Sequence, residues 1–282
     1  MLNYYNYFED NDGVKYSIDM IRFKFYCTPE KMYLLRSFIS NISDCDVYQS
    51  AKSFAYNVLL KVHIHNSVNT FAVGLGFNGL KSSEKTSCFV EFNPNRVGKC
   101  KQLIMILEYI RYLNINLDLS VYDIAIDIPI SKKYVSLIKD KRVYKKFVYD
   151  CAGVNVTEYL GSTSDCGRVK LYNKAIESEL DYDLTRLELS TNSIDYLVVS
   201  RQLPQLLVCG NLDLLDCINL SKSDFVLLQL LWQCDNPSFY FKQLGKDKQA
   251  KLKPFINSNF TLGFNEHIFT CLLKIIDKFK NF

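Results

Sequence analysis

The sequence predicts an α+β fold: a mostly antiparallel sheet with helices packed on one face, followed by a helical C-terminal region. Three observations predict it. Segments with a two-residue alternation of apolar and polar residues recur through the first 190 or so positions. Only two segments in that part have helical spacing, and beyond about residue 193 the candidate elements have mainly helical spacing. The composition is 48% hydrophobic and 23% charged over 282 residues, which supplies enough apolar material for a core.

Strands and helices alternate in the first part. The expected strands cover 16–27, 54–66, 70–77, 88–93, 120–130 and 185–191, with a hairpin over 154–177 that turns at 162–167. A helix is expected from Thr28 to about Ile42, because Thr28, Pro29 and Glu30 provide an N-cap, a first-turn proline and an early acid. The second helix, over 99–113, follows from its apolar spacing.

The last third of the chain has a different pattern. Helices are expected over 203–208, 221–233, 242–256 and 265–279. Ser221 and Asp224 have the spacing of a capping box, and Gly210 with Asn211 indicates a break. We therefore predict two domains, 1–200 and 201–282.

Bulk properties exclude some classes of protein. The net charge is only +4, so contact with nucleic acid must come from local clusters of Lys and Arg. The ten cysteines form no CxxC pair and are expected to be reduced thiols. The first residues do not resemble a signal peptide, and no run of about 18 apolar residues occurs. We expect a cytoplasmic protein without a membrane partner.

Three of the predicted strands have one apolar and one charged face, since alternate side chains of a strand point to opposite sides. The charged positions are Asp123 and Asp127 in the first, Arg168, Lys170, Tyr172 and Lys174 in the second, and Arg186 and Glu188 in the third. If these strands are neighbours, the acids repel one another unless a cation lies among them, and oxygen ligands suit Mg²⁺ or Mn²⁺. The alternative is an ordinary solvated face whose charges pair across strands.

The same segments resemble a known family. They are VYDIAIDIP at 121–129, TEYLGSTSDCGRVKLYNKAIE at 157–177 and LTRLELS at 184–190. In order and spacing they are similar to three blocks of the Rep_trans family, the rolling-circle replication initiators of pT181-type plasmids and related relaxases. The resemblance covers roughly 16–192 and is tightest over 121–190.

The resemblance implies roles for particular residues. Tyr172 corresponds to the family's nucleophile, Lys174 and Arg186 to its basic positions, and Asp123, Asp127, Glu177 and Glu188 to its acids, expected as metal ligands. Two positions depart from the family pattern. Val121 and Tyr122 stand where the family has an arginine before the first acid, and Lys170 replaces the arginine before the tyrosine.

The implied activity is DNA nicking and joining. The tyrosine would attack a DNA phosphate, leaving a 5′-phosphotyrosine and a free 3′-OH that primes a polymerase. The implied partners are origin DNA, duplex and single-stranded, a host helicase and a second copy of the chain. The domain 1–200 would cut, and 201–282 would recognise the origin or act as an accessory. The alternatives are a relaxase of a conjugative element and a non-catalytic origin-binding protein.

Basic residues outside the blocks are candidates for contacting the DNA backbone. The expected DNA-binding residues are Arg168, Lys170, Lys132, Lys133, Lys141, Arg142, Lys145 and Lys146. The alternative for 131–146 is an ordinary solvated helix. His63 and His65 have the spacing of a histidine metal motif, but two histidines on a surface strand are commoner than a metal site.

Overall fold

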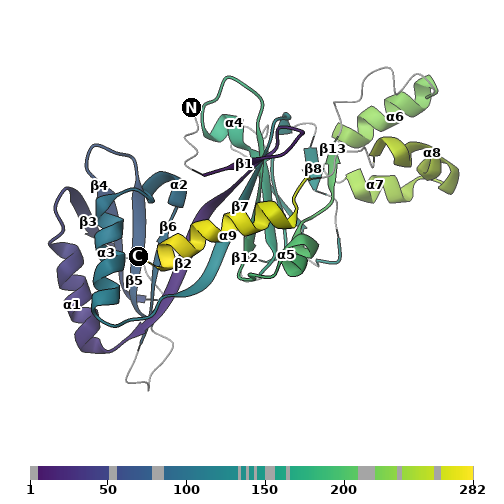
Figure 1. Cartoon of the computed structure of the whole chain (residues 1–282). Coiled ribbons are helices and arrows are strands. Elements are labelled where there is room, and N and C mark those ends of the chain that lie inside the picture. The colour runs from purple at the N-terminus through teal and green to yellow at the C-terminus, as the bar shows by residue number, and fades with distance from the viewer. Residues whose placement is uncertain are drawn as a thin grey trace. The chain divides into compact units, whose positions relative to one another are not determined.

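The computed structural model describes residues 6–50, 56–77, 86–132, 135–137, 140–142, 145–149, 156–162, 166–208, 220–233, 237–256 and 262–281 (Figure 1). The chain divides into two compact units. The first unit contains Ser17–Ile124 and Glu266–Phe282. The second unit contains Phe8–Tyr16 and Ala125–Asn265.

The first unit is built on an antiparallel sheet. Its strand order is β3 (Cys45–Gln49), β4 (Tyr56–Ile64), β5 (Thr70–Phe77), β6 (Thr86–Phe92) and β2 (Lys15–Cys27). Neighbouring strands pair antiparallel throughout this order. The two-residue period sends Ile21, Phe23 and Phe25 of β2 to one face, where all three are fully buried.

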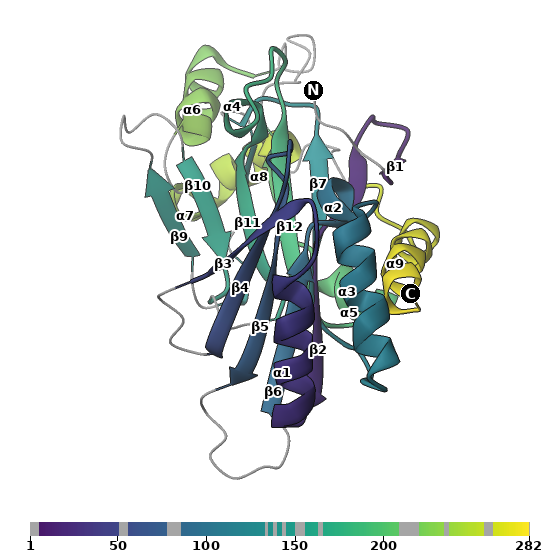
Figure 2. The same cartoon turned by 90° about the vertical axis from the view of Figure 1, so that its left-hand side faces the viewer.

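Helices cover that apolar face. Figure 2 shows α1 (Pro29–Ser40) and α3 (Lys101–Tyr112) side by side against the sheet. The rings of Phe38 and Tyr109 stack between them with centroids 3.9 Å apart. Helix α9 (Glu266–Lys280) packs on β6 through Phe279, whose ring centroid is 5.0 Å from that of Phe92. The predicted arrangement of helices on one face is confirmed in this unit.

The opposite face of the first sheet depends on a glycine. A Cβ placed on Gly74 of β5 would lie 2.0 Å from Cε1 of Phe89 on β6, its cross-strand partner. The bare backbone at Gly74 therefore lets the Phe89 ring lie flat on the sheet. The Arg22 guanidinium covers that ring, with its central carbon 4.9 Å from the ring centroid.

The second unit has its own antiparallel pairings. Its strand order is β7 (Asp118–Ile128, from Ala125 onward), β12 (Thr185–Thr191), β11 (Arg168–Asn173), β10 (Val156–Leu160) and β9 (Lys145–Tyr149). The pairs β12–β11, β11–β10 and β10–β9 are antiparallel. Val169, Leu171, Leu187 and Leu189 are fully buried on one face, and Lys170, Tyr172, Arg186 and Glu188 lie on the other.

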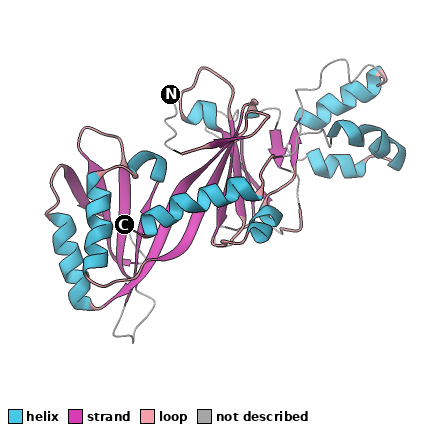
Figure 3. Cartoon of the chain, in the orientation of Figure 1, coloured by secondary structure: helices cyan, strands magenta, loops and turns pink. Residues whose placement is uncertain are grey.

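Shorter elements complete the second unit. They are the two-stranded sheet of β8 (Val135–Leu137) and β13 (Leu206–Val208), strand β1 (Phe8–Glu9), and helices α4 (Lys174–Glu177) and α5 (Tyr196–Gln202), coloured by type in Figure 3. The short helix α2 (Pro94–Val97) belongs to the first unit. Helices α6 (Lys222–Gln233), α7 (Pro237–Gln243) and α8 (Lys246–Ile256) share a small core of Leu228, Leu231 and Leu252.

The predicted α+β class is confirmed, but one predicted helix is wrong. Residues 203–208 do not form a helix, since α5 ends at Gln202 and Leu206–Val208 forms β13. Pro204 disfavours helical backbone at Leu203, which is extended with ψ near 133°. The apolar residues that follow instead pair with β8. The sequence also failed to indicate β3. The single helix predicted over 242–256 is wrong at its start, because α7 ends at Gln243 and α8 begins at Lys246.

The predicted break into 1–200 and 201–282 stays a prediction. The compact units divide elsewhere, and α9 belongs with Ser17–Ile124. Within the residues that the structure describes, no helix is both long and apolar enough to cross a membrane.

We expect Gly74→Ala to lower the free energy of unfolding by about 1–3 kcal/mol, the usual cost of overpacking a filled site. The new methyl group would displace the Phe89 ring. Urea denaturation measures the change. Gly245→Ala is the matched control, since a Cβ at position 245 meets nothing within 4 Å. We expect the Gly245→Ala variant to lose less than about 1 kcal/mol of unfolding free energy. Equal costs for the two variants would contradict the close approach.

Candidate functional site

The pairing of β11 with β12 places Tyr172 among charged side chains. Tyr172 lies opposite Arg186, and Lys170 lies opposite Glu188. All four belong to the second unit and lie on its charged sheet face, as the alternation predicted. Tyr172 is 5% exposed, so it is buried, but in polar rather than apolar surroundings.

The phenol group of Tyr172 has a defined partner. Its Oη donates a hydrogen bond of 2.6 Å to Glu188 Oε1. Lys170 Nζ lies 3.4 Å from the other carboxylate oxygen of Glu188 and 3.8 Å from the centroid of the Tyr172 ring. A carboxylate that can accept a proton and an ammonium group that can contact an anion therefore flank the phenol.

A buried ion pair lies beside the phenol. Arg186 Nε donates to Asp127 Oδ1 at 2.5 Å and Arg186 Nη2 to Asp127 Oδ2 at 2.6 Å. Both side chains are at most 3% exposed. This two-point contact fixes the plane of the guanidinium and joins β7 to β12.

The chain turns directly after Tyr172. Asn173 caps α4 by accepting a hydrogen bond from Ile176 N at 3.1 Å. The turn brings Lys174 back toward the phenol, so its Nζ lies 5.8 Å from the Tyr172 ring centroid. Lys174 is 2% exposed and contacts the Glu177 carboxylate. Burial opposes ionisation of Glu177, but the hydrogen bond from Lys174 and the positive charges of Lys174, Lys170 and Arg186 together lower the pKa of Glu177 below its ordinary value.

The surroundings of Tyr172 keep its hydroxyl group protonated. Burial, and next the negative charge of Glu188, raise the pKa of Tyr172 well above its ordinary value near 10. Arg186 acts in the opposite direction and is outweighed. Attack by this oxygen therefore requires that its proton be removed as the new bond forms.

Three of the predicted metal ligands have side-chain partners within the protein. Asp127 is held by Arg186, Glu188 by Tyr172 and Lys170, and Glu177 by Lys174. In the described ranges no three His, Cys, Asp or Glu side chains come together so that they could hold a metal ion. Asp123 belongs to the first unit. Ion pairs thus engage the carboxylates of Asp127, Glu177 and Glu188, and the Mg²⁺ or Mn²⁺ site expected from the sequence stays a prediction.

The expected DNA-binding lysines have different environments. Lys132 is 8% exposed, and its Nζ donates to Glu158 Oε1 at 2.7 Å and to the Val135 carbonyl at 2.9 Å. Glu158 Oε2 accepts a hydrogen bond from Leu137 N at 2.9 Å, so this ion pair fastens β8 to β10. Lys132 is therefore engaged within the protein, and its contact with DNA stays a prediction.

Arg142 is also used within the protein. Its guanidinium group donates to the carbonyls of Gly167 at 2.6 Å and Gln202 at 2.8 Å and pairs with Asp140. Lys141 and Lys146 are exposed, whereas Lys133 and the side chain of Lys145 lie outside the described residues. The described residues of 131–146 do not form a helix, because they contain β8 and the start of β9.

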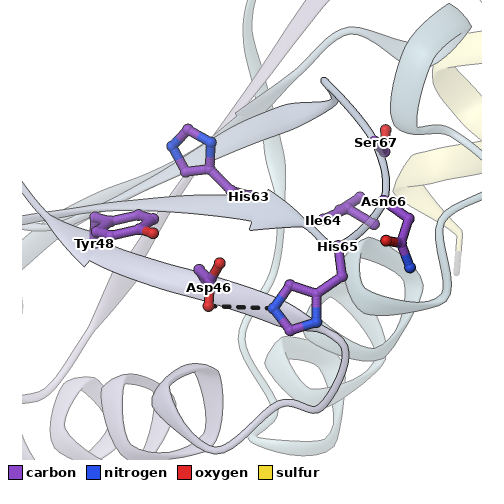
Figure 4. Close-up of a pocket in the computed structure, with 7 residues that line it drawn as sticks. All are labelled: Asp46, Tyr48, His63, Ile64, His65, Asn66 and Ser67. Atoms are coloured by element: carbon purple, nitrogen blue, oxygen red, sulfur yellow. Dashed lines mark ion pairs between the residues drawn. The ribbon is translucent and has the colours of Figure 1, made fainter.

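The histidine pair does not form a chelate. Figure 4 shows the imidazole rings of His63 and His65 pointing away from each other. His65 Nε2 lies 3.2 Å from Asp46 Oδ1, and the His63 ring meets Tyr48 edge-on with centroids 5.1 Å apart. Both histidines line an open surface pocket of the first unit.

Two lysines of the C-terminal helices also form ion pairs within the protein. Lys248 contacts Asp224 Oδ1, and Lys251 Nζ lies 2.7 Å from Asp224 Oδ2. These lysines hold α8 to the start of α6, where Ser221 and Asp224 form the predicted cap.

Comparison with known proteins adds little to this geometry. No protein-family model matches the sequence. No curated protein matches it either. Among solved structures, the chain is similar to a rolling circle replication initiator protein from Geobacillus stearothermophilus, with 14% sequence identity, a TM-score of 0.40, and coverage of 84% of this chain and 97% of that chain. A likeness of that extent assigns no function.

We expect Lys132→Met to lower the free energy of unfolding by about 3–5 kcal/mol, because it leaves Glu158 buried without its cation. Lys146→Met, in the same basic segment but exposed, should change stability by less than about 0.5 kcal/mol. Chemical denaturation of both variants tests the difference. A Lys132→Met protein as stable as the parent would contradict the buried pair.

We also expect the Tyr172 phenol to stay protonated beyond the pH at which ordinary tyrosines ionise, about 10. Since its pKa is higher in the folded chain than in the unfolded chain, its contribution to stability is present at neutral pH and lost as pH rises above about 10. The difference in tyrosinate absorbance between the parent and Tyr172→Phe should stay near zero up to the alkaline unfolding transition. A Tyr172 signal that appears near pH 10 while the chain is folded would disprove the assignment.

Proposed function

We propose that the chain initiates rolling-circle replication by nicking and rejoining one strand of origin DNA, with Tyr172 as the nucleophile. The observation that carries the proposal is the 2.6 Å hydrogen bond from Tyr172 Oη to Glu188 beside Lys170, Lys174 and Arg186. The resemblance of 121–190 to the Rep_trans blocks supports the same nucleophile.

The proposed reaction is a transesterification. The Tyr172 oxygen forms a bond to the phosphorus as the bond to the 3′ oxygen breaks. Glu188 accepts the phenol proton, and the departing 3′ oxygen takes a proton from water to become the free 3′-OH. The 5′-phosphotyrosine conserves the phosphodiester bond energy, so attack by a 3′-OH reverses the step and joins the ends.

Basic side chains near the phenol would bind the phosphate. Lys170 is 31% exposed at its side chain and is the cation most open to a ligand, whereas Lys174 and Arg186 are buried. Lys170 would thus contact the incoming phosphate first, and Lys174 would add positive charge behind the ring. These charges stabilise the extra negative charge that develops on the phosphoryl oxygens during attack.

Mg²⁺ or Mn²⁺ remains part of the proposal only through the resemblance, since the described carboxylates are already engaged. A homodimer and a host helicase rest on the same resemblance, as does a role for 201–282 in choosing the origin. A relaxase of a conjugative element would use the same chemistry and differ in the DNA sequence that it binds. A binding-only protein is favoured by one observation, the 5% exposure of Tyr172.

We expect the purified protein to relax supercoiled DNA that carries its origin and to form a covalent DNA adduct, with Mg²⁺ or Mn²⁺ supplied and, in parallel, with a chelator. Tyr172→Phe should abolish both activities. Glu188→Gln should lower the nicking rate by about 10²–10⁴-fold, the usual contribution of a proton acceptor. Tyr149→Phe is the control, because Tyr149 is 50% exposed on β9 and lies on the opposite sheet face.

Each result bears on a different part of the proposal. Nicking by Tyr172→Phe would remove Tyr172 from its role. Adduct formation by Glu188→Gln at the parent rate would remove the proposed proton acceptor. Origin binding without any cutting by the parent protein would favour the binding-only alternative.

A further inference from the structure

The charged sheet face continues from Tyr172 across two further strands. Lys170 of β11 lies opposite Glu188 on one side and opposite Tyr159 of β10 on the other. Tyr159 in turn lies opposite Lys146 of β9. The register thus forms a cross-strand row, Glu188–Lys170–Tyr159–Lys146, which spans about 14 Å because neighbouring strands are about 4.8 Å apart.

The row has an excess of positive charge. Its one acid, Glu188, is already bound by the Tyr172 hydroxyl group. Lys170 is partly exposed and Lys146 is exposed. Arg168 lies on the same face two residues before Lys170, and its guanidinium carbon is 4.7 Å from the Tyr159 ring centroid. A nucleic-acid backbone that leaves Tyr172 along this row would meet cations on both sides of Tyr159.

The aromatic ring in the row indicates what the ligand carries besides phosphates. Tyr159 is partly exposed on the charged face, while its chain neighbours Glu158 and Leu160 are buried on the opposite face. A ring beside an arginine on a sheet surface stacks with planar groups, and every nucleobase offers one. Bases within a duplex are already stacked and paired, so this contact selects unpaired nucleotides.

We propose that Tyr159, Arg168 and Lys146 form a binding site for single-stranded DNA next to the bond that is cut. Tyr159 stacks on a base, Arg168 holds the ring and adds a second planar surface, and Lys146 contacts a phosphate at the β9 end of the row. The site deepens the proposed function and rests on it for its position relative to the scissile phosphate. Its binding step, however, needs no chemistry at Tyr172.

The test measures binding of the full-length protein to a fluorescein-labelled oligo(dT) and, separately, to a blunt duplex of equal length. We expect Tyr159→Leu to weaken oligo(dT) binding by about 5- to 100-fold, which corresponds to the loss of one stacked base. Tyr159→Phe keeps the ring and should bind within about 2-fold of the parent, since stacking needs only a flat ring. Duplex binding should be unchanged in both variants.

Two further variants keep the proposal testable if Tyr159→Leu is poorly folded. Lys146→Gln should reduce the slope of log K against log salt concentration by about 0.7 for oligo(dT), the value for one lost contact with a single-stranded phosphate. Tyr149→Leu removes an exposed ring from the opposite face and should leave oligo(dT) binding unchanged.

The outcomes separate this site from the nicking mechanism. Loss of oligo(dT) affinity in Tyr159→Leu, with Tyr172→Phe still able to nick, would support the strand site and reject the nucleophile. Oligo(dT) binding that is unchanged in Tyr159→Leu and in Lys146→Gln would overturn the strand site. Equal losses for duplex and oligo(dT), or a loss in Tyr149→Leu as large as in Tyr159→Leu, would overturn it as well.

Discussion

The register between β11 and β12 fixes the chemistry of the second unit. It sets Tyr172 opposite Arg186 and Lys170 opposite Glu188. A slip of β11 by one residue would turn Lys170 and Tyr172 into the apolar layer that Leu171 and Leu187 occupy. Burial of those leucines is therefore what holds the phenol against its carboxylate, and the site depends on the core beneath it rather than on the loops around it.

The acids of the second unit's site are each paired with a basic side chain. Asp127, Glu177 and Glu188 carry negative charge in a crowded region, and each is balanced by a different basic side chain. These ion pairs offset the repulsion between the acids. Burial, and next the negative charge of Glu188, raise the pKa of Tyr172 and make it a weaker acid than an exposed tyrosine, so the carboxylate next to it has a chemical role beyond neutralising charge.

The sequence was sufficient for the alternation of strands and for the faces that carry charge, because both follow from a two-residue period. It was sufficient for the caps of α1 and α6, since Thr28 and Ser221 make the expected hydrogen bonds. It could not indicate that Arg186 would donate hydrogen bonds to both oxygens of Asp127, because the two residues are 59 positions apart in the sequence. Nor could it distinguish the buried Lys132 from the exposed Lys146, since charge density along a segment contains no information about burial. Tyr159 was overlooked for a similar reason: its importance comes from a cross-strand neighbour.

The ion pair between Lys132 and Glu158 has a consequence for sequence variation among relatives. Two buried charges that neutralise each other should change together, so substitutions at positions 132 and 158 should be correlated, and a relative with an apolar residue at one position should have lost the charge at the other. Lys141, in the same basic stretch but on the surface, has no such constraint from folding. Within sixteen consecutive positions, from 131 to 146, selection would then act on lysines for entirely different reasons.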